Sequence, residues 1–233
     1  MEKYPIEITE KRVVKRITVR QTLVDFLDAF NVERGIVYTI KLLATKPGRL
    51  VRYYLTDGRY KIVNAFRLLI ITTAISLILL NVTNSFEFLY KVQTPNGAEE
   101  AAALKAGMDL MKEWYNLYLW LSIPCYALAS FLLFRKYEKF NYAEHLVIQS
   151  FLISVSNLLI ILTLPLSIWI GVDMAFVFSF VFGSFYYLFL FYDVFKRRTF
   201  GFFMRTIFSY VFGNFLYFLL ISVVMAVLMV SSQ

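Results

Sequence analysis

Long apolar stretches alternate with short polar or basic connections over the last two thirds of the chain. The pattern predicts five membrane-spanning helices, at about residues 62–82, 114–134, 146–170, 174–192 and 207–230. A helix needs about 20 apolar residues to cross the hydrocarbon of a bilayer. The run from Leu68 to Val82 is shorter than that, so we expect the first span to begin within Ile62–Phe66. The sequence therefore predicts an all-α fold, a polytopic transmembrane helix bundle.

The connections and the first 67 residues predict further helices. Residues 83–113 form a polar loop, in which Asn96 and Glu99 have the spacing of a capping box and begin a helix. Before the first span, apolar residues recur at helical spacing in three segments, from Thr18 to Phe30, from about Glu33 to Ala44 and from Pro47 to Asp57. We therefore divide the chain into an amphipathic module, 1–67, and a bundle, 68–233.

Composition and charge agree with this class and predict an orientation. Hydrophobic residues make up 59% of the chain and charged residues 17%, which leaves too little polar surface for a water-soluble globule. Of the 24 Lys and Arg residues, 21 lie in residues 1–67, 135–146 and 196–205, which are alternate connections. The positive-inside rule then predicts a cytoplasmic N-terminus and an extracytoplasmic C-terminus. Because the rule accounts for the net charge of +8, nucleic acid is not expected as a partner.

The basic module supplies the first set of candidate contact residues. Residues 1–67 hold 14 Lys or Arg against 7 acidic residues. An anionic membrane surface attracts each well-placed basic residue by about 1 kcal/mol. We therefore expect contact with anionic lipid head groups, or with a protein partner, through Arg49, Arg52, Arg59, Lys61 and Arg67.

The third span carries a stripe of polar side chains. Gln149, Ser156 and Thr163 recur every seven residues, and Ser150 and Asn157 stand beside them at the same spacing. Such a stripe either joins helices by hydrogen bonds or lines a polar path through the membrane. The candidates for a path are Gln149, Ser156, Asn157 and Thr163.

Three other polar residues are weaker candidates. Glu144 and His145 are adjacent and hence about 100° apart on a helix, so they cannot chelate a metal ion together, and a role at a helix start is the alternative to catalysis. Asp193 precedes Lys196, Arg197 and Arg198, which favours an interfacial ion pair over a functional acid. One cysteine and one histidine exclude an intrachain disulfide and a Cys/His metal cluster. We expect no cofactor, no metal and no enzymatic activity.

Two glycine-containing segments are alike. Val181–Tyr187 (VFGSFYY) matches Val211–Tyr217 (VFGNFLY) at an offset of 30 residues. Either an internal duplication or close helix packing at Gly183 and Gly213 explains the likeness.

Several short motifs point to a family. They are Asp25-Phe26, Gly35 with Thr39, Tyr54-Leu55, Gly58-Arg59, Phe66-Arg67 and Tyr142–Val147. With them the chain resembles an uncharacterised family of bacterial multi-pass membrane proteins, known as a domain of unknown function. The resemblance implies a location in the bacterial cytoplasmic membrane and supplies no reaction. Many members begin with a four-cysteine zinc ribbon, which this chain lacks, and Ala65 stands where proline is common.

The function expected from these observations is transport or scaffolding by a non-enzymatic membrane protein. In this hypothesis the basic helices engage anionic lipid or a partner. The alternative is a transporter of a small solute or ion that uses the polar face of the third span.

Overall fold

The computed structural model describes residues 34–56, 62–85, 105, 107, 109, 112–137 and 140–231, with side chains up to residue 224. The helix predicted from Thr18 to Phe30 and most of the helix predicted after Asn96 lie outside these residues. Contacts divide the chain into Met1–Arg34 and Gly35–Gln233. The helices that follow Arg34 belong to the same unit as the spans.

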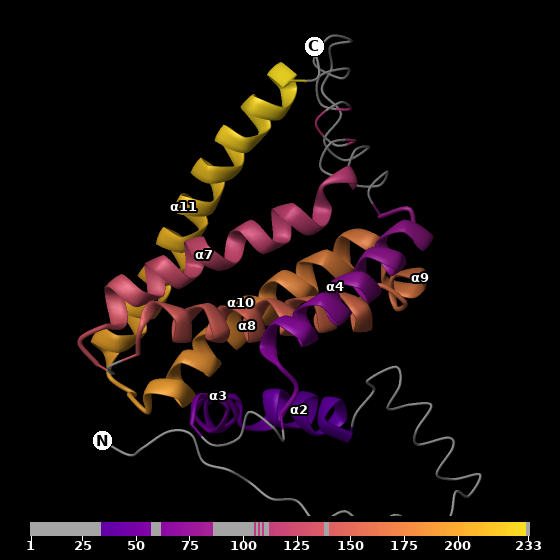
Figure 1. Cartoon of the computed structure of the whole chain (residues 1–233). Coiled ribbons are helices and arrows are strands. Elements are labelled where there is room, and N and C mark those ends of the chain that lie inside the picture. The colour runs from indigo at the N-terminus through magenta and orange to yellow at the C-terminus, as the bar shows by residue number, and fades with distance from the viewer. Residues whose placement is uncertain are drawn as a thin grey trace, which may run out of the picture. The chain divides into compact units, whose positions relative to one another are not determined.

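Five helices are long and apolar enough to cross a membrane, as the sequence predicts. They are α4 (Ala65–Val82), α7 (Tyr115–Phe134), α8 (Tyr142–Thr163), α10 (Val172–Phe195) and α11 (Phe200–Ser231). Short connections join the last four of them in an antiparallel series (Figure 1). The part of the chain that the structure describes is thus an all-helical bundle, which confirms the predicted fold class and is compatible with a multi-pass, membrane-embedded protein.

The first span begins within the predicted range Ile62–Phe66, at a residue that a cap selects. The Asn64 side chain accepts hydrogen bonds from the backbone N–H groups of Phe66 (2.9 Å) and Arg67 (3.4 Å). Helix α4 accordingly begins at Ala65, while Ile62 and Val63 are buried in a non-helical approach to it. Two N–H groups that the helix leaves without an intrahelical partner are satisfied in this way.

The third span is shorter than its predicted range and begins earlier. The Asn141 side chain accepts from the Glu144 N–H (2.9 Å) and the Glu144 carboxylate accepts from the Asn141 N–H (2.7 Å), so a capping box starts α8 at Tyr142. Helix α8 ends at Thr163, before Pro165, because proline has no N–H with which to continue the backbone hydrogen bonds of the helix. A separate turn, α9 (Ser167–Ile170), covers the rest of the predicted range 146–170.

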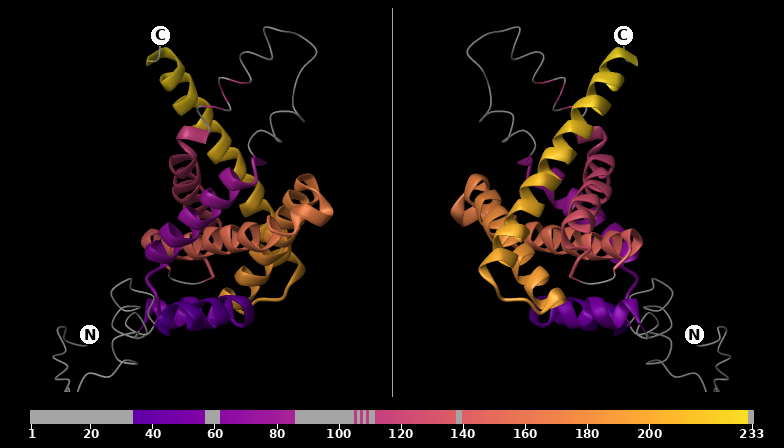
Figure 2. Two further views of the ribbon diagram at one scale, coloured as in Figure 1. Left: turned by 90° about the vertical axis from the view of Figure 1, so that its right-hand side faces the viewer. Right: turned by 90° about the vertical axis from the view of Figure 1, so that its left-hand side faces the viewer.

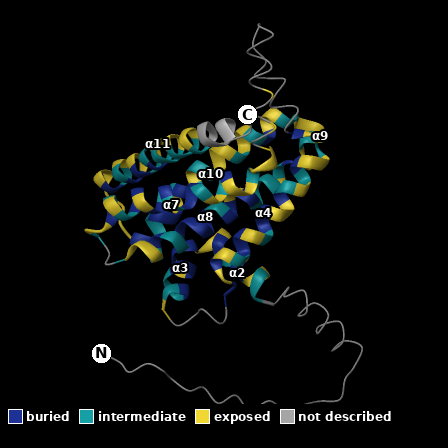
Figure 3. Cartoon of the chain, turned by 45° about the horizontal axis from the view of Figure 1, so that its top comes forward, coloured by how far each residue is buried: buried dark blue, intermediate teal, exposed yellow. Residues whose placement is uncertain are grey.

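Helix α8 lies at the centre of the bundle. It contacts α4, α7 and α10, whereas α11 packs mainly on α7. Helices α7 and α8 carry small buried side chains, including Ala127, Ser130 and Ser154, which let helix backbones approach closely. Burial is accordingly dense on α7 and α8, and exposed residues dominate α9 and much of α11 (Figure 3).

Two amphipathic helices pack on one end of the bundle, and both are confirmed predictions. Helix α2 (Arg34–Thr45) and helix α3 (Pro47–Leu55) follow one another across this end, and α3 packs on α10 (Figure 2). Leu50 and Val51 are fully buried, and the ring of Tyr54 meets that of Phe151 on α8 edge to face, with centroids 5.4 Å apart. We call this end, where α4, α8 and α11 begin, the basic end.

Candidate functional site

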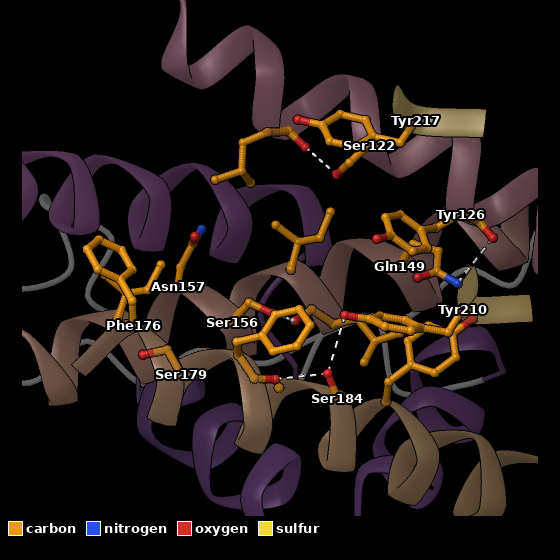
Figure 4. Close-up of a pocket in the computed structure, with 17 residues that line it drawn as sticks. Ser122, Tyr126, Gln149, Ser156, Asn157, Phe176, Ser179, Ser184, Tyr210 and Tyr217 are labelled. Carbon is orange, nitrogen blue, oxygen red and sulfur yellow. Dashed lines mark hydrogen bonds between the residues drawn. The ribbon is translucent and has the colours of Figure 1, made fainter. Parts of the chain in front are cut away.

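The polar stripe of α8 lines a cavity of about 360 Å³ between α7, α8, α10 and α11. Gln149, Ser156 and Asn157 all belong to its wall (Figure 4). Thr163 does not, but its hydroxyl shares a hydrogen bond of 2.7 Å with Ser179, which does. The structure therefore brings three of the four predicted path residues to one cavity and ties the fourth to its wall.

Most of the wall comes from helices that the sequence did not single out. The polar members are hydroxyl groups from α7, α10 and α11, namely Ser122, Tyr126, Ser179, Ser184, Tyr187, Tyr210 and Tyr217. A signal for them exists in the spacing, because Ser179, Gly183 and Tyr187 are four residues apart and Tyr210 and Tyr217 seven apart, as one helix face requires. The polar path predicted from the sequence includes residues of the third span only.

Asn157 is the polar group of the wall that is least satisfied. Its side chain is 1% exposed, and its Nδ2 donates to the hydroxyl oxygen of Thr73 (2.9 Å) on α4. Its Oδ1 is buried and has no hydrogen-bond partner. A buried polar atom without a partner costs about 1–3 kcal/mol, and the hydrogen bond from Nδ2 to Thr73 turns this amide toward α4.

The other wall groups form a network that fixes their positions. Gln149 Nε2 donates to the carbonyl oxygen of Tyr126 (3.4 Å) and to Ser130 Oγ (3.2 Å). The Ser184 hydroxyl donates to that of Tyr210 (3.3 Å), which ties α10 to α11 across the cavity. Every wall residue in the described part of the chain is uncharged, so the cavity offers hydrogen bonds without a fixed charge.

The two similar glycines have different surroundings. A Cβ placed at Gly213 would lie 2.4 Å from Cδ1 of Tyr126, so this glycine allows α11 to approach α7. A Cβ at Gly183 would meet only Ser156 Oγ, at 3.8 Å, and Gly183 lines the cavity. Close packing of α11 on α7 therefore requires a glycine at position 213. At position 183 the missing side chain leaves room in the cavity instead.

Glu144 and His145 do not act on a common centre. Glu144 belongs to the capping box of α8, as the alternative to catalysis supposed. His145 is fully buried, and its Nδ1 lies 2.9 Å from Ser130 Oγ. Among the described residues, no group of three or more His, Cys, Asp or Glu side chains is arranged to hold a metal ion.

Asp193 and Arg52 join α3 to α10 reciprocally. The Asp193 carboxylate accepts from the backbone N–H of Gly48 (2.7 Å) at the start of α3, where the helix dipole favours an anion. In return, Arg52 Nη1 donates to the backbone carbonyl oxygens of Asp193 and Val194 at the end of α10. The expected pairing of Asp193 with Lys196–Arg198 is thus corrected: its partner is a helix terminus 145 residues away in the sequence.

The predicted lipid-contact residues differ in how far their side chains are exposed. Arg49 is exposed, Arg67 is half-buried at the start of α4, and Arg52 is engaged with α10. Arg59 and Lys61 lie outside the described residues. Further exposed basic residues share the basic end with Arg49, namely Lys41, Lys46, Lys196, Arg197 and Arg198.

Comparison of the chain with protein-family models, with curated proteins and with solved structures gave no match. The family resemblance stated above therefore stays a prediction. The functions proposed below rest on the geometry of the cavity and of the basic end.

Proposed function

We propose that this protein is a non-enzymatic transporter that binds a small uncharged solute in the cavity between α7, α8, α10 and α11. The observation that carries the proposal is a membrane-embedded cavity walled by hydroxyl and amide groups. Uncharged polar side chains in a span either join helices or line a solute pathway, and the cavity beside this stripe favours the pathway.

The chemistry of the wall supports an uncharged solute. Moving an unpaired charge from water into an apolar site costs far more than moving a hydroxyl or an amide, and the described wall offers no opposite charge. A hydroxylated solute would exchange its water hydrogen bonds for those of Tyr, Ser, Gln and Asn side chains. With about 30 Å³ for each water molecule, 360 Å³ corresponds to about a dozen waters, which suits a polyol of a few carbon atoms.

The test is osmotic swelling of proteoliposomes, followed by stopped-flow light scattering, with glycerol, erythritol and xylitol as probes. We expect protein-dependent entry of at least one polyol and none of potassium chloride. Ser156→Leu and Gly183→Leu place side chains in the cavity without removing a hydrogen bond between helices, so both should abolish entry. The control is Ser222→Leu, at an exposed site on α11 that does not line the cavity. Equal rates with and without the protein for every polyol would refute the proposal.

A second proposal concerns the basic end: its exposed basic residues bind anionic lipid head groups. The supporting observation is the docking of α3 on α10, which places Lys46 and Arg49 at the same end of the bundle as Lys196–Arg198. An anionic leaflet attracts such residues by about 1 kcal/mol each before screening.

This proposal is tested by mass spectrometry of lipids that co-purify with the protein. Lys46→Glu with Arg49→Glu should lower the ratio of phosphatidylglycerol to phosphatidylethanolamine. Arg52 is left intact because it binds α10. Lys105→Glu with Lys112→Glu, at exposed residues between α4 and α7, is the matched control and should leave the ratio unchanged. An equal ratio in both double variants would refute lipid binding at the basic end.

A further inference from the structure

An apolar groove of about 430 Å³ lies between α4, α7 and α8, apart from the cavity. Its floor is buried, since Leu69 and Ile123 are 3% and 5% exposed. Its rim consists of exposed aromatic and aliphatic side chains, namely Phe66, Ile70, Trp120 and Tyr142. The groove is therefore open to whatever surrounds the bundle.

The groove exists because α4 and α7 each pack on α8 but pack little on each other. At the end of the bundle opposite the basic end, Tyr115 of α7 packs against the buried cluster of Leu80 and Leu164. Nearer to the basic end, the first turns of α4 and α8 leave space beside α7. The Tyr142 hydroxyl donates to the carbonyl oxygen of Pro124 (3.3 Å), which holds the Tyr142 ring against α7 as one wall of this space.

The chemistry of the lining favours a hydrocarbon chain as the occupant. The only polar side-chain groups of the lining are the Tyr142 hydroxyl and the indole N–H of Trp120. Water needs two to four polar partners in such a place, so an apolar groove does not hold it. The groove lies between helices that are long and apolar enough to span a membrane, where the available hydrocarbon is the acyl chain of a lipid.

An acyl chain by itself gives no selectivity among lipids, because lipid tails are as apolar as the groove. The charge beside the rim supplies it. Arg67 lies between Phe66 and Ile70 on the surface of α4, where residues three apart are neighbours. Its guanidinium forms no hydrogen bond or ion pair within the described part of the chain. Arginine lays its apolar stem along such a surface, keeps its charged end at the head groups and binds phosphate by paired hydrogen bonds.

No acidic side chain competes on the facing part of α8. Glu144 is two residues from Tyr142 and hence about 200° around the helix from it. The Glu144 carboxylate also accepts from the Asn141 N–H in the capping box. The charge next to the groove is therefore positive, which favours a lipid whose head group is anionic.

We propose that the groove between α4, α7 and α8 binds one anionic phospholipid, with an acyl chain along Leu69 and Ile123 and the phosphate at Arg67. This site is separate from the lipid contacts proposed for Lys46 and Arg49. It depends neither on those contacts nor on polyol transport.

The test uses tryptophan fluorescence, because Trp120 lines the groove whereas Trp114 and Trp169 do not. The full chain with Trp114→Phe and Trp169→Phe is placed in phosphatidylcholine vesicles. A small fraction of the lipid is phosphatidylglycerol or phosphatidylcholine with brominated acyl chains, which quench a tryptophan that they touch. Brominated phosphatidylglycerol should quench Trp120 with an apparent affinity about five-fold higher, the effect expected for one basic residue at an anionic surface. The control keeps Trp114 alone, exposed on the same helix outside the groove, and should be quenched equally by both lipids.

Variants separate the head group from the chain. Arg67→Gln should remove the preference for phosphatidylglycerol and leave quenching by the acyl chains, whereas Lys46→Glu with Arg49→Glu should leave both. Leu146→Phe narrows the groove and should weaken quenching of Trp120 by both lipids. Equal quenching of Trp120 by the two lipids overturns the proposal, and so does quenching of Trp114 without quenching of Trp120, which would mean that another chain covers the groove. The comparison of the two lipids decides even if Leu146→Phe does not fold, and failure of polyol entry leaves this site intact.

Discussion

Gly48 is the position where the docking of α3 on α10 is most sensitive to a single methyl group. A Cβ at Gly48 would lie 2.2 Å from the backbone C and O atoms of Asp193 and 2.5 Å from the backbone N of Val194. These are main-chain atoms of a helix, so no side-chain rotation relieves the overlap. Gly48→Ala therefore requires α3 to move away from α10, which lengthens the hydrogen bonds of Asp193 and Arg52.

The magnitude follows from the contacts that would be lost. Overpacking in a close interface costs about 1–3 kcal/mol. Complete undocking would expose Leu50 and Val51, which are fully buried and contribute about 1.5–3 kcal/mol each. Without the overlap Gly48→Ala would stabilise the protein, because alanine in a helix is about 0.5–1 kcal/mol more favourable than glycine. We expect Gly48→Ala to be destabilising by at least about 1 kcal/mol.

Hydrogen–deuterium exchange of α3, together with equilibrium unfolding in SDS, measures this effect. The control is Gly201→Ala, because Gly201 is also the second residue of its helix but has nothing within 4 Å of an added Cβ. Gly48→Ala should speed exchange throughout α3, and Gly201→Ala should leave it unchanged. If both variants keep α3 equally protected, α3 does not pack on α10 as the structure has it.

Three further predictions concern other contacts. Asp193→Asn removes the charge at the start of α3 and should speed exchange there by the equivalent of about 0.5–1 kcal/mol, whereas Asp173→Asn should not. Gly213→Ala should be destabilising by about 1–3 kcal/mol in the same unfolding assay because its Cβ meets the ring of Tyr126, while Gly183→Ala should leave stability within about 0.5 kcal/mol and slow polyol entry. Reporter fusions after residue 233 and within 83–113 should both report the extracytoplasmic side; a cytoplasmic signal from either would refute the predicted orientation.

The hydrogen-bond caps illustrate how far local sequence reaches. The capping box of Asn141 and Glu144 involves residues three apart, so its consequence, the start of α8 at Tyr142, is local. The apolar run begins only at Leu146, so hydropathy predicts a later start than the cap gives. Pro165 is equally local, and it ends the helix inside the predicted range.

Some residues of the candidate site can be recognised in the sequence, and others are placed only by helix packing. The stripe of Gln149, Ser156 and Asn157 is visible in the sequence because polar side chains are unusual in a span. The tyrosines that complete the cavity leave a weaker signal, only their spacing of four or seven residues, because α10 and α11 are rich in aromatic residues on most of their surface. The hydrogen-bond partners of His145 and Asp193, which are Ser130 and Gly48, likewise come from helix packing.

The sequence by itself determined the class, the five spans and two of the helices before them, since bilayer thickness and helical periodicity act on local composition. Only the tertiary structure decided which faces meet, where the cavity lies and what Asp193 binds. The physical reason is that lipid is as apolar as a helix interior, so hydrophobicity does not distinguish a lipid-facing side chain from a packed one. Which face packs is decided by close approach at glycine, by hydrogen bonds between helices and by contacts with helix termini. The two residues of each such contact lie far apart in the chain.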